Sequence, residues 1–142
     1  MRLQKASVAT KHVWVADSKT GDWNLCNVIG QENSSMTLQN LTSGERFTYD
    51  TAFGEVFQAN ESIYPDMTYL RHLHEAAILH NLRERLLARE PYTFMGSVLI
   101  SVNPFEWLEN PNPATFAGKS MESDKPHPFA IAGNYLPFLV CP

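Results

Sequence analysis

The hydrophobic pattern of this chain changes its period near Tyr64-Pro65-Asp66, and this change constrains the fold more than any other feature. Before it, short apolar runs alternate with polar and glycine turns, which is typical of antiparallel strands. After it, apolar residues recur at the spacing of one helix face. The sequence therefore predicts an α+β chain, in which a small β-unit precedes a region of helix, strand and loop.

Five short strands are expected in the first part of the chain. Strands this short and this regularly spaced favour a small antiparallel barrel or sandwich, with residues 1–10 as a tail and residues 11–58 as the β-unit. The expected strands are residues 12–16, 23–29, 36–41, 46–49 and 55–57, with turns at residues 17–22, 30–33 and 42–45.

The aromatic residues of this part have two interpretations. Trp14, Trp23, Phe47 and Tyr49 could line a groove for a proline-rich peptide. At strand spacing, however, such residues more often fill a barrel core. We favour the core interpretation and keep a peptide-binding module as the alternative.

The second part, residues 59–142, begins with helical signals. Asp66 is a suitable N-cap for a short helix over residues 67–70. A longer helix is predicted over residues 73–89, with Ile78, Leu82 and Leu86 on its buried face and Arg83 to Arg85 on its solvent side. Pro91 ends this helix.

A β-branched run at residues 98–102 predicts a central strand buried on both faces, stopped by Asn103-Pro104. Residues 109–128 contain four prolines and are expected to form a loop. A short helix over residues 129–135 should follow, and Pro137 should break any continuation.

Composition excludes several classes of protein. With 44% hydrophobic and 18% charged residues, the chain is globular rather than disordered. Its net charge of −4 argues against a nucleic-acid binder. It contains neither an apolar run of about 20 residues, as a membrane span needs, nor a signal-peptide pattern. The two cysteines, Cys26 and Cys141, indicate no disulfide framework and suggest a reducing compartment.

Two short motifs resemble known sites but lack essential residues. Gly118-Lys119-Ser120 matches the end of a phosphate loop, yet Pro113 stands where the first glycine is required. His74-Glu75 matches the start of a zinc-protease helix, yet Ile78 replaces the second histidine. An ordinary turn and ordinary histidines are the better interpretations, so no metal ligand and no catalytic residue is predicted.

Two longer segments carry a family resemblance. Residues 66–85, beginning Asp66-Met67-Thr68-Tyr69-Leu70, resemble the first motor-domain segment of myosins. Residues 92–105, ending Ser101-Val102-Asn103-Pro104-Phe105, are similar to the family at the expected separation. Residues 125–132 resemble the next family landmark, and residues 11–58 resemble the SH3-like barrel that precedes many myosin motors.

The resemblance implies the start of an actin-based motor that hydrolyses ATP with Mg²⁺ in the cytoplasm, as part of the cytoskeleton. It implies a long helix, one central strand, a loop and a short helix from an incomplete α/β P-loop domain. The implied partners are the remainder of the motor domain and, through it, actin filaments. The loop at Asn103, Pro104 and Phe105 is implied to contact the adenine side of the nucleotide.

This chain departs from the family pattern at that loop. The pattern continues with a second proline and a tyrosine, but Glu109 and Pro111 occupy these positions, and Glu106 stands where many members have a basic residue. Phe105, Trp107 or Phe116 could supply an apolar wall instead. Because the chain ends before the expected phosphate loop, it is expected to be inactive as an ATPase by itself and to bind nucleotide weakly at most.

Overall fold

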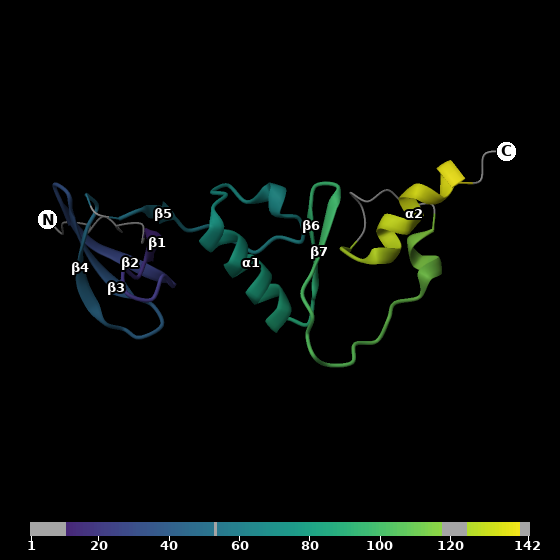
Figure 1. The fold of residues 1–142 in the computed structure, drawn as a ribbon, viewed down its shortest axis with the longest axis horizontal. Helices are drawn as coiled ribbons and strands as arrows, with labels where there is room; N and C mark the ends of the chain where they lie inside the picture. The colour runs from purple at the N-terminus through teal and green to yellow at the C-terminus, as the bar shows by residue number, and fades with distance from the viewer. Residues whose placement is uncertain (1–10, 53, 118–124, 140–142) are drawn as a thin grey trace, which may run out of the picture. The chain divides into compact units, whose positions relative to one another are not determined.

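The computed structural model describes residues 11–52, 54–117 and 125–139, with side chains described as far as Gly133. The chain forms two compact units, residues 1–60 and residues 61–142 (Figure 1). The expected tail (residues 1–10), the Gly118-Lys119-Ser120 motif and Cys141 lie outside the described residues.

The first unit is one antiparallel sheet of five strands, in the order β4-β3-β2-β1-β5. All five expected strands are confirmed within three residues at each end. The strands are β1 (His12–Ala16), β2 (Trp23–Glu32), β3 (Ser35–Asn40), β4 (Arg46–Asp50) and β5 (Val56–Gln58).

The expected turn at residues 30–33 is wrong, because β2 continues through Glu32. A bulge between Val28 and Gly30 shifts the register against β3, so the extra residue bends the strand without ending it. The chain reverses instead at Asn33, whose φ of 52° lies in the left-handed region that asparagine tolerates.

The core of this unit lies on one face of the sheet and is formed by alternate residues of β1, β2 and β3. Phe47 and Tyr49 of β4 pack against it, as the core interpretation of the aromatics expects. Trp14 is also buried, and the ring of Trp23 lies 5.5 Å from that of Phe57. The buried core residues are Val13, Val15, Cys26, Met36 and Leu38.

In its described residues, the second unit contains two helices, two short 3-10 helices and a hairpin. Asp66 caps the first 3-10 helix by accepting a hydrogen bond from the backbone N–H of Thr68, as expected. The elements are η1 (Met67–Tyr69), α1 (Glu75–Leu87), β6 (Tyr92–Met95), β7 (Val98–Ser101), η2 (Pro113–Phe116) and α2 (Pro128–Leu139).

Helix α1 buries a different face from the one predicted. Its buried residues are Ala76, Ala77, Asn81 and Arg85, while Leu79 and Leu87 are exposed and the predicted Ile78, Leu82 and Leu86 are half-buried. The placement of Arg85 on the solvent side is therefore wrong. Asn81 and Arg85 are buried because hydrogen-bond partners on neighbouring segments satisfy their polar groups.

The predicted strand is confirmed over residues 98–101, but its expected central position, buried on both faces, is wrong within the described residues. Residues 92–101 form a two-stranded hairpin, in which Gly96 makes the turn at a φ of 61°. Strand β7 is therefore paired with β6 alone, and Val98 is 59% exposed.

Helix α2 extends past Pro137 to Leu139, so this proline does not end it. The loop of residues 109–128 contains one turn of 3-10 helix, η2, which packs on α2. Gly133 permits this approach, since a Cβ there would lie 3.0 Å from the carbonyl oxygen of Phe116.

Candidate functional site

A groove of about 980 Å³ crosses the second unit beside the Asn103-Pro104 loop. One wall is the end of α1 and the start of β6, another is residues 104–111, and the third is formed by Phe116 of η2 and by residues 125–127. The groove thus brings together segments from both sides of the hairpin.

Of the three predicted site residues, the structure places only Pro104 on the groove wall. Asn103 supports the loop, because its side-chain oxygen accepts a hydrogen bond from the backbone N–H of Phe105 at 2.9 Å. Phe105 has a φ of 53° and is 92% exposed, so its ring is not part of the described wall.

Two aromatic residues line the groove as the predicted apolar substitutes. Phe116 is buried, whereas Trp107 is 99% exposed. Glu109 and Pro111, which replace the expected proline and tyrosine, also line it. The groove therefore keeps apolar surface although the family's tyrosine is missing.

Arg85 forms the buried end of the groove. Its Nε donates to the hydroxyl of Thr93 at 2.9 Å, and one terminal nitrogen donates to the carbonyl of Tyr92 at 2.8 Å. The other terminal nitrogen lies 2.9 Å from the carboxylate of Glu90. With all three nitrogens engaged, Arg85 joins α1 to β6 and is a structural residue of the groove.

A second ion pair joins Arg89, two residues past the end of α1, to the loop. Arg89 lies 3.0 Å from the carboxylate of Glu106, and both side chains are about half exposed. Exposed pairs of this kind contribute roughly 0–1 kcal/mol, so the pair orients the loop more than it stabilises the fold. Glu106 thus brings a negative charge to the wall at the position where a basic residue was expected.

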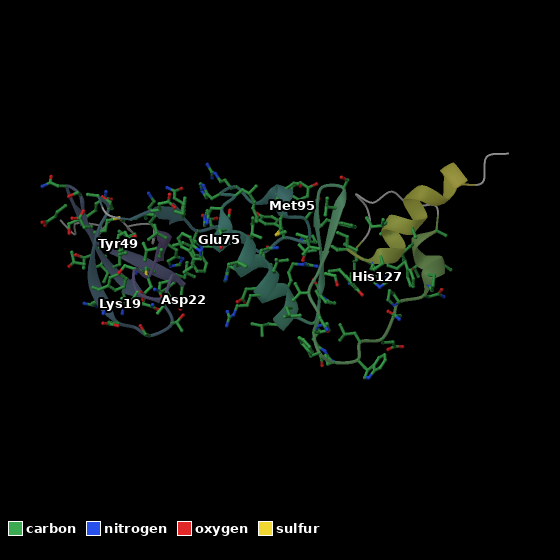
Figure 2. All side chains as sticks on the ribbon, in the orientation of Figure 1. Lys19, Asp22, Tyr49, Glu75, Met95 and His127 are labelled. Carbon is green, nitrogen blue, oxygen red and sulfur yellow. The ribbon has the colours of Figure 1, made fainter. Side chains whose placement is uncertain are left out.

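His127 closes the groove within a cluster of aromatic rings (labelled in Figure 2). Its ring stacks on the ring of Phe116, with 5.3 Å between the ring centroids, and meets the ring of Tyr92 edge-on, with 5.0 Å between the centroids. Its Nδ1 accepts a hydrogen bond from the backbone N–H of Phe129 at 3.1 Å. Burial lowers the pKa of His127 below its usual value of 6.5, so the imidazole is neutral at pH 7.

Sequence reasoning missed Arg85 and His127 as groove residues. Arginine usually lies in solvent, and the sequence predicts a loop without a catalytic motif at His127. The run Lys125-Pro126-His127-Pro128-Phe129 resembles a landmark of the family and does not by itself indicate a groove residue. Two prolines around a histidine immediately before a helix were a usable signal.

The predicted non-sites have structural roles where they are described. His74 caps α1, its Nδ1 accepting the backbone N–H of Ala77 at 3.3 Å. Within residues 11–52, 54–117 and 125–139, no group of three His, Cys, Asp or Glu side chains could hold a metal ion. No helix in the same residues is long and apolar enough to cross a membrane.

Comparison with known proteins first identifies the class, which is a motor protein. The family model of the myosin head (motor domain) matches residues 64–140, more than half of the chain. The chain therefore belongs to the myosin head family.

One similar curated protein is the Myosin-J heavy chain of Dictyostelium discoideum. It is 32% identical to this chain in an alignment 126 residues long, and the alignment covers 84% of this chain and 6% of the relative. The chain thus spans a small part of the length of the relative it matches.

Proposed function

We propose that this chain acts as the amino-terminal part of a myosin that moves on actin filaments by hydrolysing ATP. The observation that carries the proposal is the family match over residues 64–140, which includes α1, the hairpin and the whole Asn103-Pro104 loop. In this proposal the first unit is the SH3-like barrel and the second is the start of the P-loop motor domain.

The groove is proposed to receive the adenine side of ATP. Pro104, Trp107 and Phe116 supply apolar surface of the kind that a planar base requires. Arg85 and Arg89 are each paired with a glutamate, and the third cation of the groove walls, Lys125, is balanced in charge by Glu109, which leaves little net positive charge for phosphates. We therefore expect the groove to favour the base over the triphosphate.

By themselves, residues 1–142 are proposed not to hydrolyse ATP. Phosphoryl transfer depends on a phosphate loop, its lysine and a bound Mg²⁺ ion, which together position and stabilise the transferred group. In this sequence the nearest pattern, Gly118-Lys119-Ser120, lacks the first glycine of such a loop. Cofactor chemistry would then depend on the remainder of the motor.

Trp107 provides the test of nucleotide binding, because a base entering the groove must change the surroundings of its exposed indole. The full chain is titrated with adenosine and separately with ATP and Mg²⁺, while tryptophan fluorescence is recorded. We expect weak saturable quenching by both ligands with similar midpoints. The variant Trp107→Phe should lose this signal, and Trp23→Phe, in the other unit, should keep it.

Two outcomes would contradict these proposals. An unchanged Trp107 signal up to millimolar adenosine would exclude the groove as the adenine site. Steady phosphate release by the purified chain, with or without actin filaments, would exclude the proposed inactivity. The first result leaves the family assignment intact, since that assignment rests on the sequence match.

A second candidate function is non-enzymatic interaction, either of the β-unit with a partner or of the second unit with the rest of a motor. Leu79 and Leu87 on α1 and Val98 on β7 are more than half exposed and so offer apolar surface to a partner. We therefore expect residues 66–139 to be less protected from hydrogen exchange than residues 12–58 in the isolated chain. Uniform strong protection there would count against a docking role.

A further inference from the structure

We propose that His127 is a pH-dependent positioning residue, whose neutral imidazole holds the start of α2 against the hairpin and releases it on protonation. The proposal does not depend on nucleotide binding. It rests on the hydrogen bond to Phe129, on the packing around the ring and on the position of His127 at the helix end.

The first step concerns the hydrogen bond. His127 directly precedes Pro128, so it occupies the N-cap position of α2 with proline at the first helical residue. Its Nδ1 accepts the N–H of Phe129, one of the donors that a helix leaves unpaired at its start. A protonated Nδ1 carries a hydrogen and becomes a donor, so this bond exists only while the ring is neutral.

The second step concerns charge. An imidazolium at this position would place a positive charge at the positive end of the helix dipole, where cations are disfavoured. His127 is buried, with 7% of the residue exposed, so water compensates poorly for this charge. Stacking on Phe116 favours a cation, whereas burial opposes it and lowers the pKa of His127.

The third step concerns the packing partners. The ring centroids of Phe116, Phe129 and Tyr92 lie 5.3 Å, 4.6 Å and 5.0 Å from the centroid of the His127 ring. Among the described residues, η2 and the start of α2 contribute no ionisable group, and β6 contributes Tyr92. The charged groups on the groove walls are Arg85, Arg89, Glu90, Glu106, Glu109 and Lys125.

Protonation of His127 would therefore affect three elements, which are α2, β6 and η2. Loss of the Phe129 bond frees the start of α2, and movement of the ring removes the contact that His127 makes with Tyr92 and Phe116. Because His127 also forms part of the groove wall, acidification would change the shape of the groove.

The test compares His127→Asn with the natural chain. Asparagine offers an oxygen close to the position of Nδ1 and is a strong N-cap, but it does not titrate. The amide protection factor of Phe129 is measured by NMR in the full chain from about pH 7.5 to about pH 5, a range that spans the ordinary titration of histidine. We expect at least a tenfold loss of protection in the natural chain and no loss in His127→Asn.

A third variant separates the cap from the packing. His127→Phe keeps a ring but offers no acceptor, so it should leave Phe129 poorly protected at every pH. His72→Gln, which changes another histidine of the same unit, should behave as the natural chain. Constant protection of Phe129 in the natural chain, or an equal pH-dependent loss in His127→Asn, would overturn the proposal.

Discussion

Arg85 and Thr93 form a buried hydrogen bond, in which the arginine Nε donates to the threonine hydroxyl at 2.9 Å. Both residues are less than one-tenth exposed. The bond joins two elements of the second unit, because Arg85 belongs to α1 and Thr93 to β6. A polar contact therefore occupies a place where an apolar one is usual.

The first prediction concerns this arginine. Arg85→Met keeps most of the side-chain volume but leaves Thr93, the carbonyl of Tyr92 and Glu90 without their partner. Leaving buried acceptors unpaired costs about 1–3 kcal/mol. The free energy of unfolding of the second unit, measured by hydrogen exchange in increasing urea, should fall by an amount in this range.

Arg83→Met is the matched control, because Arg83 lies on the same helix and 70% of its side chain is exposed. Its effect on stability should remain within about 0.5 kcal/mol. Equal losses in the two variants would show that the buried bonds do not stabilise the unit.

The second prediction concerns Asn81, which is fully buried and makes two hydrogen bonds to one residue. Its side chain accepts the N–H of Tyr64 at 2.8 Å and donates to the carbonyl of Tyr64 at 3.0 Å. Asn81→Leu removes both bonds and should destabilise the second unit by roughly 2–4 kcal/mol, from two unpaired backbone groups. Leu79→Asn, on the exposed side of α1, should leave the stability nearly unchanged. A lower urea unfolding midpoint for Leu79→Asn than for Asn81→Leu would disprove this prediction.

The third prediction concerns pH and Asp66. Burial opposes ionisation of this carboxyl, but hydrogen bonds from the N–H and hydroxyl of Thr68 and from the N–H of Gly96 outweigh it, so the pKa lies below 3.8. As the pH falls, Asp66 therefore becomes protonated in the unfolded chain at a higher pH than in the folded chain. The stability from Asp66 is present above pH 3.8 and is lost as the pH falls through the lower folded value.

Asp66→Asn removes this titration, so the two proteins should differ in urea midpoint at neutral pH and converge on acidification below the unfolded pKa. Hydrogen exchange at Gly96 reports the same change locally. A difference in urea midpoint between the two proteins that stays constant with pH would show that Asp66 is not the titrating group.

The fourth prediction concerns Cys26, the buried thiol of the β-unit. Burial raises the pKa of this thiol from 9.0 to about 11. In a Cys141→Ser background, alkylation should be slow in the folded chain and fast in urea, because the thiolate is the reactive form. The stability from this raised pKa is present below pH 9.0 and is lost as the pH rises through about 11. Equal alkylation rates in the two conditions would disprove the burial.

The strands of the β-unit were predictable because their signals are local. Gly21 and Gly44 each have a φ of 76°, and both lie in turns that were expected from composition. The continuation of β2 past Gly30 was not predictable in this way, since a bulge depends on its register against β3.

The buried face of α1 and the hairpin were not predictable from hydrophobic pattern. Asn81 and Arg85 are buried only because Tyr64 and Thr93 satisfy them, and no pattern along the helix reports those partners. Gly96 lay just before the β-branched run, and its role as a turn follows from pairing between residues 92–95 and 98–101.

The resemblance pointed to Asn103, Pro104 and Phe105 as nucleotide contacts, and this role stays a prediction. Pro104 lines the groove, Asn103 supports its loop, and Phe105 is not among the lining residues. Arg85 and His127 also line the groove, and only the folded chain brings them together.

The polar bonds of the second unit also bear on how the chain folds during synthesis. The bonds of Asn81 to Tyr64, of Arg85 to Thr93 and of Asp66 to Gly96 span 17, 8 and 30 residues. All of them lie between residues 64 and 96, and contacts of short sequence separation form quickly. Once residues 64–96 have left the ribosome, these bonds can therefore form without the loop at Asn103 or any later residue.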